Sequence, residues 1–437
     1  MEGRLQRRYA QLVREHMHAA QTVAAGLSAL PGVNRAFAST QAAWRFYAND
    51  SVTLPKLIEP LRAAGRQALQ RQDQGAATGP DSRVLLVHDW CKLNYSAHTS
   101  KTDQVQLSNS RDIGYELYTA LLVDADRGTP LCPMEQELKA AGGVHTTRHT
   151  RRAQPQHPLD QILPTMQASQ RWDLGRQIVH VIDREADSLF HWRKWTQHGH
   201  QFLVRIRDDR GVQWNGCGWK VPQIAQKLWQ DGAFRETRRV EFHGKSARQF
   251  VAEAPVTLHK PGRRLLPDGR RQSIPGPPLT LRLVIARVCD EDGRILAEWL
   301  LLTNVPEAVS AGRLALWYYW RWRIESYHKL LKSAGQQVEY WQQESAAAIA
   351  KRLLVASMAC VSVWLLARQQ TPLAQECQRV LVRLSGRQMK RSRPVTEPAL
   401  LAGLERLLAV LDLLEHYTIG DLRRIMHQTI PFLTDSG

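Results

Sequence analysis

Residues 84–89 read Val-Leu-Leu-Val-His-Asp, four apolar residues that lead directly to a histidine and an aspartate. A short apolar run of this kind is typical of a β-strand that is buried on both faces. The pattern returns at residues 178–182, a second mainly apolar run, which ends at Asp183. Carboxylates at the ends of neighbouring buried strands can converge on one point. The two stretches therefore predict an α/β fold in which Asp89 and Asp183 meet.

The chain between these strands is predicted to form a hairpin and a helix. Residues 115–123 and 129–131 are rich in strand-forming residues, and they flank Asp-Ala-Asp-Arg-Gly at 124–128, which is typical of a turn. A helix is expected at residues 159–170. The predicted order is strand, hairpin, helix, strand, with an aspartate after the first and the last strand.

Helices are predicted before this core. Residues 36–47 contain few helix breakers, and Thr-Leu-Pro at 53–55 resembles a helix start with proline in the first turn. The polar stretch 71–82 contains glycine and proline and indicates a linker. Residues 1–70 are therefore expected to form a helical block that precedes the core.

Residues 205–303 are rich in strand signals, and loops that contain glycine, proline and arginine interrupt them. One such loop is expected at 260–278. Strands are predicted at 202–207, 240–242, 279–288 and 296–303. The chain is then expected to be helical from 311 to about 368, and a short helical tail follows a basic break at 387–394.

The charge of the chain favours a polyanionic partner. Its 437 residues include 59 Lys and Arg against 41 Asp and Glu, which gives a formal charge of +18. A basic surface gains free energy by releasing the counterions that condense on nucleic acid. The alternative is a basic protein that binds no polyanion.

No feature of the sequence favours a membrane or a secreted protein. The uncharged apolar run at 353–367 has fifteen residues, fewer than the ~20 that span a bilayer, and is expected to be a buried helix. Residues 1–18 are charged and lack the apolar segment of a secretory signal. The six cysteines are scattered rather than paired. A cytoplasmic location is expected.

Residues 318–332 read Tyr-Tyr-Trp-Arg-Trp-Arg-Ile-Glu-Ser-Tyr-His-Lys-Leu-Leu-Lys. At about 100° per residue, one face of a helix here carries a polar stripe and the other face is apolar. The stripe consists of Tyr318, Arg321, Glu325, Lys329 and Lys332, and the apolar face of Trp320, Ile324, Tyr327 and Leu331. The alternative is a solvated face with ion pairs four residues apart, each contributing only ~0.3–0.5 kcal/mol.

The spacing of the stripe resembles a known signature. Tyr318, Arg321, Glu325 and Lys332 stand at the spacing of the YREK signature of bacterial insertion-sequence transposases of the IS-four family. Three further stretches resemble blocks of that family. They are Asp-Arg-Glu-Ala-Asp at 183–187, His88-Asp89 with Tyr95-Ser96, and residues 39–47, which resemble its amino-terminal DNA-binding domain.

The resemblance implies an RNase H-like catalytic core with a β-rich insertion before the last acidic residue, flanked by helical regions. It also implies cut-and-paste transposition through a hairpin at the transposon end, inside a synaptic homodimer. The expected segments are a DNA-binding domain at 1–70, a linker at 71–82, the core at 83–204 and 304–369, the insertion at 205–303, and a C-terminal region at 370–437 that is a candidate for dimerisation contacts.

The resemblance makes Asp89, Asp183 and Glu325 the catalytic residues. Phosphodiester cleavage needs an activated water or 3′ hydroxyl and stabilisation of the charge on the phosphate, and two divalent cations about 3.5–4 Å apart supply both. Mg²⁺ prefers carboxylate oxygens, so these three residues are the expected ligands of two Mg²⁺ ions, with Mn²⁺ as a substitute. Glu185 and Asp187 are the alternative ligands.

Several basic and aromatic residues are expected to contact DNA. Arg321 would bind a phosphate by its bidentate fork and Lys332 as a point charge, while Tyr318 would donate a hydrogen bond to another phosphate. Four further basic residues are expected to contribute: Lys329, Arg323, Arg205 and Arg184.

Trp299 has two interpretations. It lies in the apolar run Glu-Trp-Leu-Leu-Leu-Thr at 298–303 and is on that ground a core residue. The resemblance instead matches it to a family tryptophan that receives a base flipped out of the hairpin end.

The expected function is that of a DNA transposase acting on transposon ends and target DNA, both double-stranded. Two alternatives remain at this point. One is an RNase H-like nuclease that never joins DNA ends. The other is a catalytically inactive DNA-binding regulator.

Overall fold

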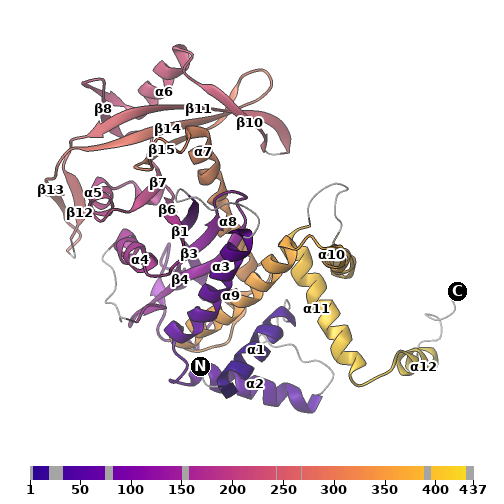
Figure 1. Ribbon diagram of the computed structural model, residues 1–437. Coiled ribbons are helices and arrows are strands. Elements are labelled where there is room, and N and C mark those ends of the chain that lie inside the picture. Colours follow the sequence, from indigo (N-terminus) through magenta and orange to yellow (C-terminus); the bar gives the residue numbers. More distant parts are fainter. Residues whose placement is uncertain are drawn as a thin grey trace.

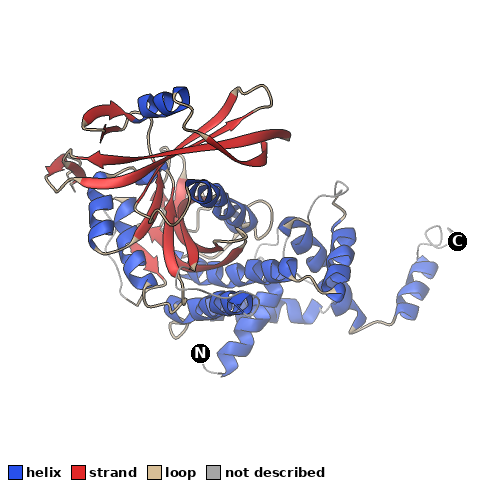
Figure 2. Cartoon of the chain, turned by 45° about the horizontal axis from the view of Figure 1, so that its top comes forward, coloured by secondary structure: helices blue, strands red, loops and turns tan. Residues whose placement is uncertain are grey.

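A computed structural model describes residues 3–18, 33–73, 82–149, 157–242, 244–266, 268–387 and 395–429. It is a mixed α/β structure in which helices pack around a large twisted sheet (Figures 1 and 2). Most of the predicted linker, and all of the predicted basic break except residue 387, lie outside the described residues.

The central strands have the predicted order along the chain. β1 (Arg83–Asn94), β3 (Ile113–Asp124) and β4 (Pro130–Ala140) are antiparallel neighbours. On the other side of β1 follow two parallel strands, β6 (Gln177–Ile182) and β7 (Gln201–Arg205). The predicted hairpin turn at 124–128 connects β3 to β4, although β4 is much longer than expected. The short strands β2 (Val105–Gln106) and β5 (Gly143–Thr146) pair with β3 and β4.

The predicted helix after the hairpin is present as a 3-10 turn, η1 (Pro158–Gln161), followed by α4 (Ile162–Ser169). A second 3-10 turn, η2 (Arg184–Ala186), and α5 (Leu189–Gln197) connect β6 to β7. These connections separate the parallel strands in the sequence while leaving them adjacent in the sheet.

The β-rich region continues the same sheet beyond β7. β15 (Ile295–Thr303) pairs with β7, and β14 (Leu279–Cys289), β11 (Lys245–Leu258), β8 (Gly211–Trp214) and β9 (Cys217–Lys220) follow in order. β10 (Arg235–Phe242) pairs with β11, and α6 (Val221–Gln230), which the sequence did not predict, covers part of this layer. Figure 1 shows the layer at the top of the molecule. The prediction of a loop at 260–278 was wrong, because this segment contains a second sheet formed by β12 (Gly262–Leu265) and β13 (Arg271–Ile274).

The C-terminal third is helical but interrupted. Its helices are α7 (Ala311–Trp320), α8 (Trp322–Leu331), α9 (Ala346–Arg368), α10 (Pro372–Ser385), α11 (Glu397–Leu414) and α12 (Ile419–Thr429). The prediction that the chain is helical from 311 to about 368 therefore holds for α7, α8 and α9 but not for residues 332–345. A loop with one 3-10 turn, η3 (Val338–Tyr340), separates α8 from α9. Gln337 has a left-handed backbone there, and a side chain at Gly335 would collide with the carbonyl of Leu330, so the helix cannot continue.

Helix α9 is the centre of the helical layer. It contains the apolar run at 353–367, and its burial confirms the predicted buried helix. Among the described residues it is the single helix long and apolar enough to cross a membrane, yet 78% of its apolar window is buried inside the protein. That burial is typical of a core helix.

The N-terminal helices pack against this layer. They are α1 (Gly3–His18), α2 (Val33–Ala48) and α3 (Leu54–Asp73). All three contact α9, and α3 also lies on β4. Leu12, Phe46 and Leu57 belong to the same hydrophobic core as the central strands. DNA contacts by residues 1–70 would thus have to use the surfaces that this packing leaves exposed.

Candidate active site

Asp89 and Asp183 lie where the parallel strands β1 and β6 separate. His88 and Ile182 form the last residue pair between these strands, and each aspartate is the next residue along its chain. β1 does not end at Asp89, as the sequence suggested, but continues to Asn94 while pairing with β3. The aspartates therefore stand at an opening edge of the sheet, where side chains from other elements can reach them.

Arg321 brings the two aspartates together with Glu325. Its Nη2 atom lies 2.7 Å from Oε1 of Glu325 and 3.3 Å from Oδ2 of Asp183, and its Nη1 atom lies 3.9 Å from Oδ2 of Asp89. We call these four residues the Arg321 junction. The three carboxylates that the sequence singles out thus converge on one point, and a guanidinium group occupies that point.

The α7–α8 segment presents its polar side to the strands. Arg321, the residue between the two helices, has φ −52° and ψ −33°, so the helical path continues through it. The predicted apolar face is buried at Trp320, Ile324, Tyr327 and Leu331. Tyr318 and Arg321 are buried as well. The interpretation of the stripe as a solvated face is therefore wrong for these two residues, although Lys329 is exposed.

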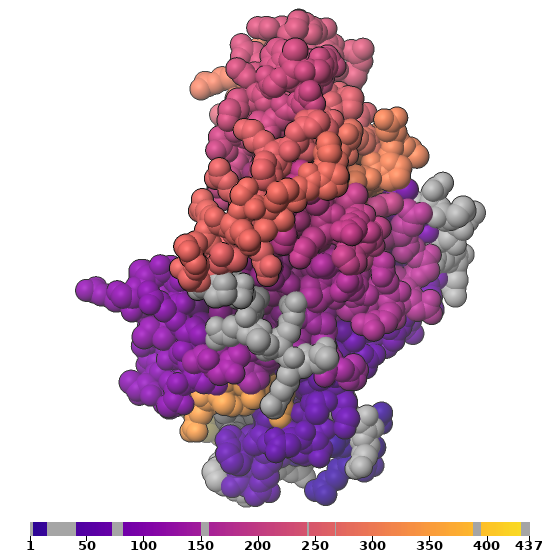
Figure 3. Space-filling view, turned by 90° about the vertical axis from the view of Figure 1, so that its left-hand side faces the viewer, coloured from indigo at the N-terminus to yellow at the C-terminus, as the bar shows by residue number. Residues whose placement is uncertain are grey.

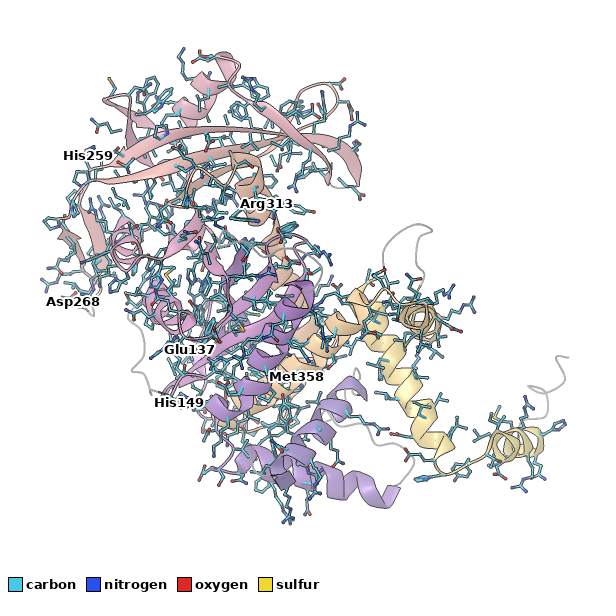
Figure 4. The ribbon with its side chains drawn as sticks, viewed as in Figure 1. Glu137, His149, His259, Asp268, Arg313 and Met358 are labelled. Carbon is cyan, nitrogen blue, oxygen red and sulfur yellow. The ribbon has the colours of Figure 1, made fainter. Side chains whose placement is uncertain are left out.

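The turn between β3 and β4 anchors this helix pair. Arg313, labelled in Figure 4, and Trp317 donate hydrogen bonds to the carbonyl of Ala125 at 2.7 and 2.8 Å. Nε of Arg323 donates to the carbonyl of Gly128 at 2.8 Å. The structure thus places the Arg323 guanidinium on the protein's own backbone and outside the Arg321 junction.

Each aspartate is also held by a backbone amide. The amide of Trp90 donates to Oδ1 of Asp89 at 2.9 Å, and the amide of Arg184 donates to Oδ1 of Asp183 at 2.7 Å. The hydroxyl of Tyr318 donates to the same oxygen of Asp183 at 2.8 Å. These bonds orient both carboxylates without using their second oxygen atoms, which face Arg321.

The two aspartates differ in acidity. Burial raises the pKa of Asp89 to about 7, although Arg321 acts in the opposite direction. Burial also acts to raise the pKa of Asp183, but Arg321, the Arg184 amide, Tyr318 and Arg205 together outweigh it and lower that pKa below its ordinary value. Arg205, at the end of β7, is thus close enough to act on Asp183, as expected of a basic residue at this site.

His328 is a site residue that the sequence interpretation missed. Its Nδ1 atom lies 3.9 Å from Oδ2 of Asp89, and its buried Nε2 atom has no hydrogen-bond partner among the described residues. Burial, with Lys332 and Arg321 nearby, lowers the pKa of His328 to about 3, so the ring is neutral. Its position three residues after Glu325, within the stripe segment, was an available signal.

The donor atoms of the Arg321 junction suit a hard divalent cation. Three carboxylates converge, and carboxylate oxygens are the ligands that Mg²⁺ prefers. Within the described ranges, however, no three His, Cys, Asp or Glu side chains are arranged to hold an ion jointly, and the guanidinium of Arg321 lies between the carboxylates. Binding of Mg²⁺ here therefore requires Arg321 to move aside.

The remaining predicted residues lie around the Arg321 junction rather than in it. Nζ of Lys332 donates to the carbonyl of Lys92 at 3.0 Å and forms an ion pair with Glu339 at 2.8 Å. Arg184 is exposed and lines a cavity beside Glu185. The side chains of Lys332 and Arg184 could contact a phosphate only if they rotated or if the DNA came close to them.

The two alternative ligands have different surroundings. The side chain of Asp187 is 1% exposed, forms an ion pair with Arg210 and accepts a hydrogen bond from the amide of Arg207 at 2.9 Å. It fixes the loop after β6, and it would have to leave Arg210 in order to bind a metal ion. Glu185 is exposed, and its charge acts to raise the pKa of Asp89. Glu185 thus remains close to the Arg321 junction.

Trp299 lies half-buried on β15 against the central core. Leu301, two residues on and hence on the same face of the sheet, pairs with Arg205. Trp299 therefore contacts the core and also shares a sheet face with a residue of the candidate site.

A second cluster of charges, which the sequence did not predict, lies inside the molecule. Arg148 forms ion pairs with Glu135 and Glu137, both on β4 (Glu137 is labelled in Figure 4). We call these three residues the sealed cluster. Gln161 donates to Glu137 at 2.9 Å and accepts from the indole of Trp90 at 2.6 Å. The sealed cluster thus supports the residue that follows Asp89.

No protein-family model matches this chain. Its function is accordingly inferred from the chemistry of the site. Three convergent carboxylates, one buried guanidinium and the nearby basic residues are the kinds of group that bind divalent cations and phosphates.

Proposed function

We propose that the protein is a DNA transposase that cleaves transposon ends and joins them to target DNA at the Arg321 junction. The observation that carries the proposal is the convergence of Asp89, Asp183 and Glu325 on one guanidinium, from two strands and a helix that are far apart in the sequence. Residues that had only a structural role at these positions would not need three carboxylates facing one opening.

The proposal includes an RNase H-like core. Its support is the order of the central strands, three antiparallel and two parallel, with the aspartates at adjacent positions on β1 and after β6. The β-rich layer precedes the Glu325 helix in the chain, as the family resemblance leads one to expect. Helix α8, which carries Glu325, contacts β1.

The carboxylates of Asp89, Asp183 and Glu325 would hold two Mg²⁺ ions, which Mn²⁺ can replace. When bound, such ions activate the attacking oxygen and stabilise charge on the phosphate. Arg321 would leave the carboxylates and donate to a phosphate through its bidentate fork. Tyr318 would keep Asp183 oriented by the hydrogen bond that it already donates. Arg205 would add positive charge beside the reacting phosphate.

The proposed partner is double-stranded DNA, both the transposon ends and the target, bound by a homodimer in a synaptic complex. The formal charge of +18 supports a polyanionic partner. On α2, Trp44 and Arg45 are exposed while Phe46 and Tyr47 are buried, which leaves a surface for end-specific contacts. Apolar residues exposed on α11, such as Val410 and Leu411, are available for contacts with a second copy.

A product assay tests this proposal. The protein is incubated with candidate element ends, a target plasmid and Mg²⁺, with a Glu325→Gln variant as the matched control. Nicked, hairpin and joined products from the wild-type protein alone would support it. Cleavage without joined products would favour a nuclease on the same site. End binding without any Mg²⁺-dependent product would favour an inactive DNA-binding regulator.

A further inference from the structure

The hairpin of β12 and β13 forms a basic arm on the side of the molecule that Figure 3 faces. We define the arm as β12, β13 and the flanking residue Lys260. Figure 4 labels His259 near its base and Asp268 in the turn at its tip. In Figure 3 the orange-red atoms of this part of the chain run down beside the magenta surface of earlier residues. The arm exposes Arg263, Arg264 and Arg271.

Contacts with α5 hold the arm in place. Arg193 on α5 donates to the carbonyl of Lys260 at 3.0 Å and to the carbonyl of Pro277 at 2.8 Å, so one side chain holds both ends of the hairpin. A side chain at Gly262 would come within 2.9 Å of the Phe190 backbone. The close approach of the arm to α5 is therefore built into the sequence, and its position is set before any ligand arrives.

A groove of about 450 Å³ lies between the arm and the loops that follow β6 and β7. Seven of its charged lining residues are Lys or Arg and four are Asp or Glu. One of the four acids, Asp187, is neutralised by its ion pair with Arg210. The groove therefore has an excess of positive charge.

At least four of the seven cations of the groove have no ion pair among the described residues. Arg207, Lys260, Arg263 and Arg271 are exposed and have no ion pair within the part of the chain that the structure describes, whereas Arg270 at the tip is paired with Asp268. Holding four like charges near one another without partners costs free energy that an anion would recover.

The groove opens next to the Arg321 junction. Glu185 lines it and lies two residues after Asp183, close enough for its charge to act on Asp89. Arg207 lines it and lies two residues after Arg205. A strand of nucleic acid whose phosphate reached the carboxylates could therefore continue past Arg184 and Arg207 into the groove.

We propose that the basic arm and its groove bind the phosphodiester backbone of duplex DNA that extends from the Arg321 junction. The identity of the polymer rests on the proposed function. Duplex DNA is favoured over a single strand because, among the described residues, the groove lining includes no Phe, Tyr or Trp on which unpaired bases could stack. Contacts of this kind position DNA and add affinity without reading its sequence.

The test measures DNA binding without cleavage. Lys260, Arg263 and Arg271 are replaced together by Gln, and binding to a long duplex of arbitrary sequence is measured in EDTA over a range of salt concentrations. The expected result is a Kd raised about tenfold or more, and a slope of log K against log salt that is shallower by about 3, close to one unit for each lost phosphate contact.

The matched control removes the same charge elsewhere. Arg379, Arg383 and Arg387, exposed on and just after α10, are replaced together by Gln. In Figure 1, α10 lies on the other side of the molecule from β12 and β13. Equal losses in the two triple variants would show a general effect of net charge and overturn the proposal. An unchanged Kd in the arm variant would do so too, as would a larger loss for single-stranded than for duplex DNA.

A second variant guards against misfolding. Lys in place of Arg263 and Arg271 keeps the charge, so its slope should equal that of the wild-type protein, and equal melting temperatures check the fold. A slope as shallow as that of the Gln variant would overturn the proposal.

If no DNA is cleaved with Mg²⁺ but the arm variant still loses duplex affinity, the catalytic proposal alone fails. If cleavage occurs and the arm variant binds as the wild type does, the arm proposal alone fails.

Discussion

The Arg321 junction and the sealed cluster use the same device, one guanidinium between acidic side chains, in opposite surroundings. In the sealed cluster the side chains of Glu135 and Glu137 are 0% exposed and that of Arg148 is 10% exposed. In the Arg321 junction the arginine side chain is 4% exposed, but the carboxylates of Asp89, Asp183 and Glu325 are 20, 31 and 38% exposed.

This difference separates a structural role from a chemical one. Carboxylates that water cannot reach need their cation permanently, because an unpaired buried charge is costly. Carboxylates at an opening can exchange a guanidinium for another cation, since solvent and ligands reach them. The comparison therefore predicts that substitutions in the sealed cluster affect stability, whereas substitutions in the Arg321 junction affect activity and metal binding.

The largest expected effect is on cleavage. Asp183→Ala, Asp89→Ala or Glu325→Ala should each reduce Mg²⁺-dependent cleavage by more than about a hundredfold, the upper range for loss of a residue that merely supports a metal ligand. End binding, measured by gel shift, should stay largely intact because the basic surface is unchanged. An Asp183→Ala protein that still nicked DNA at close to the wild-type rate would remove the residue from the catalytic set.

The next effect is on stability, and it concerns the sealed cluster. Arg148→Met keeps much of the volume of the side chain but leaves two buried carboxylates without their cation. The free energy of unfolding, measured by urea denaturation, should fall by about 3–5 kcal/mol at neutral pH. The matched substitution Arg321→Met leaves its carboxylates partly solvated and should cost far less. Equal losses in the two variants would break the comparison.

The loss of unfolding free energy in Arg148→Met should depend on pH. Burial raises the pKa of Glu135 to about 7 from an ordinary 4.5, even though Arg148 acts to lower it, so removing Arg148 raises that pKa further. A carboxyl whose pKa is raised by folding stabilises the folded state fully below its unfolded pKa and loses that contribution as the pH rises through the folded pKa. The variant should therefore be nearest to the wild type at about pH 5 and furthest from it at about pH 8. A loss independent of pH would show that packing is responsible.

The convergence of the three carboxylates in the Arg321 junction was predictable from the sequence, whereas the position of Arg321 between them was not. The apolar runs before Asp89 and Asp183 indicated buried strands, and the stripe of residues at 318–332 placed Glu325 on a helix. The pairing of Lys332 with Glu339 was not predictable, because the sequence did not predict the loop between α8 and α9 in which Glu339 lies.

The sealed cluster was not predictable by the same reasoning. β4 contains Glu135, Gln136 and Glu137 in succession, a composition that argues against a buried strand. The burial depends on Arg148, which reaches β4 only because β5 returns beside it. Hydrophobic periodicity contains no information about such long-range charge pairing. For this reason the sequence predicted only residues 129–131 of that strand.

A smaller effect concerns the binding of Mg²⁺, which should depend on the Arg321 junction and not on the sealed cluster. Mg²⁺ at about a hundred times its Kd should raise the free energy of unfolding by about 2.7 kcal/mol in the absence of DNA. Because Arg321 must leave the carboxylates first, Arg321→Met should bind Mg²⁺ more tightly than the wild type, by calorimetric titration. Arg148→Met should keep the wild-type affinity. Weaker binding in Arg321→Met would mean that the guanidinium helps to assemble the metal site.

The smallest effect concerns Trp299, which has features of both a structural and a chemical residue. It is half-buried against the core, as a structural residue would be, and it shares a sheet face with Arg205 beside the Arg321 junction. A hairpin DNA end has a terminal turn too tight for every base to stay stacked, and an aromatic face recovers about 1–3 kcal/mol per stacked base. Trp299→Ala should therefore slow hairpin formation and opening by about fivefold to a hundredfold while leaving first-strand nicking unchanged. A tryptophan that served the core alone would give the opposite pattern, a lower melting temperature with equal losses at all three steps. Measuring the melting temperature beside the three rates decides between them, and a folded variant with all three rates unchanged would exclude Trp299 from the reaction.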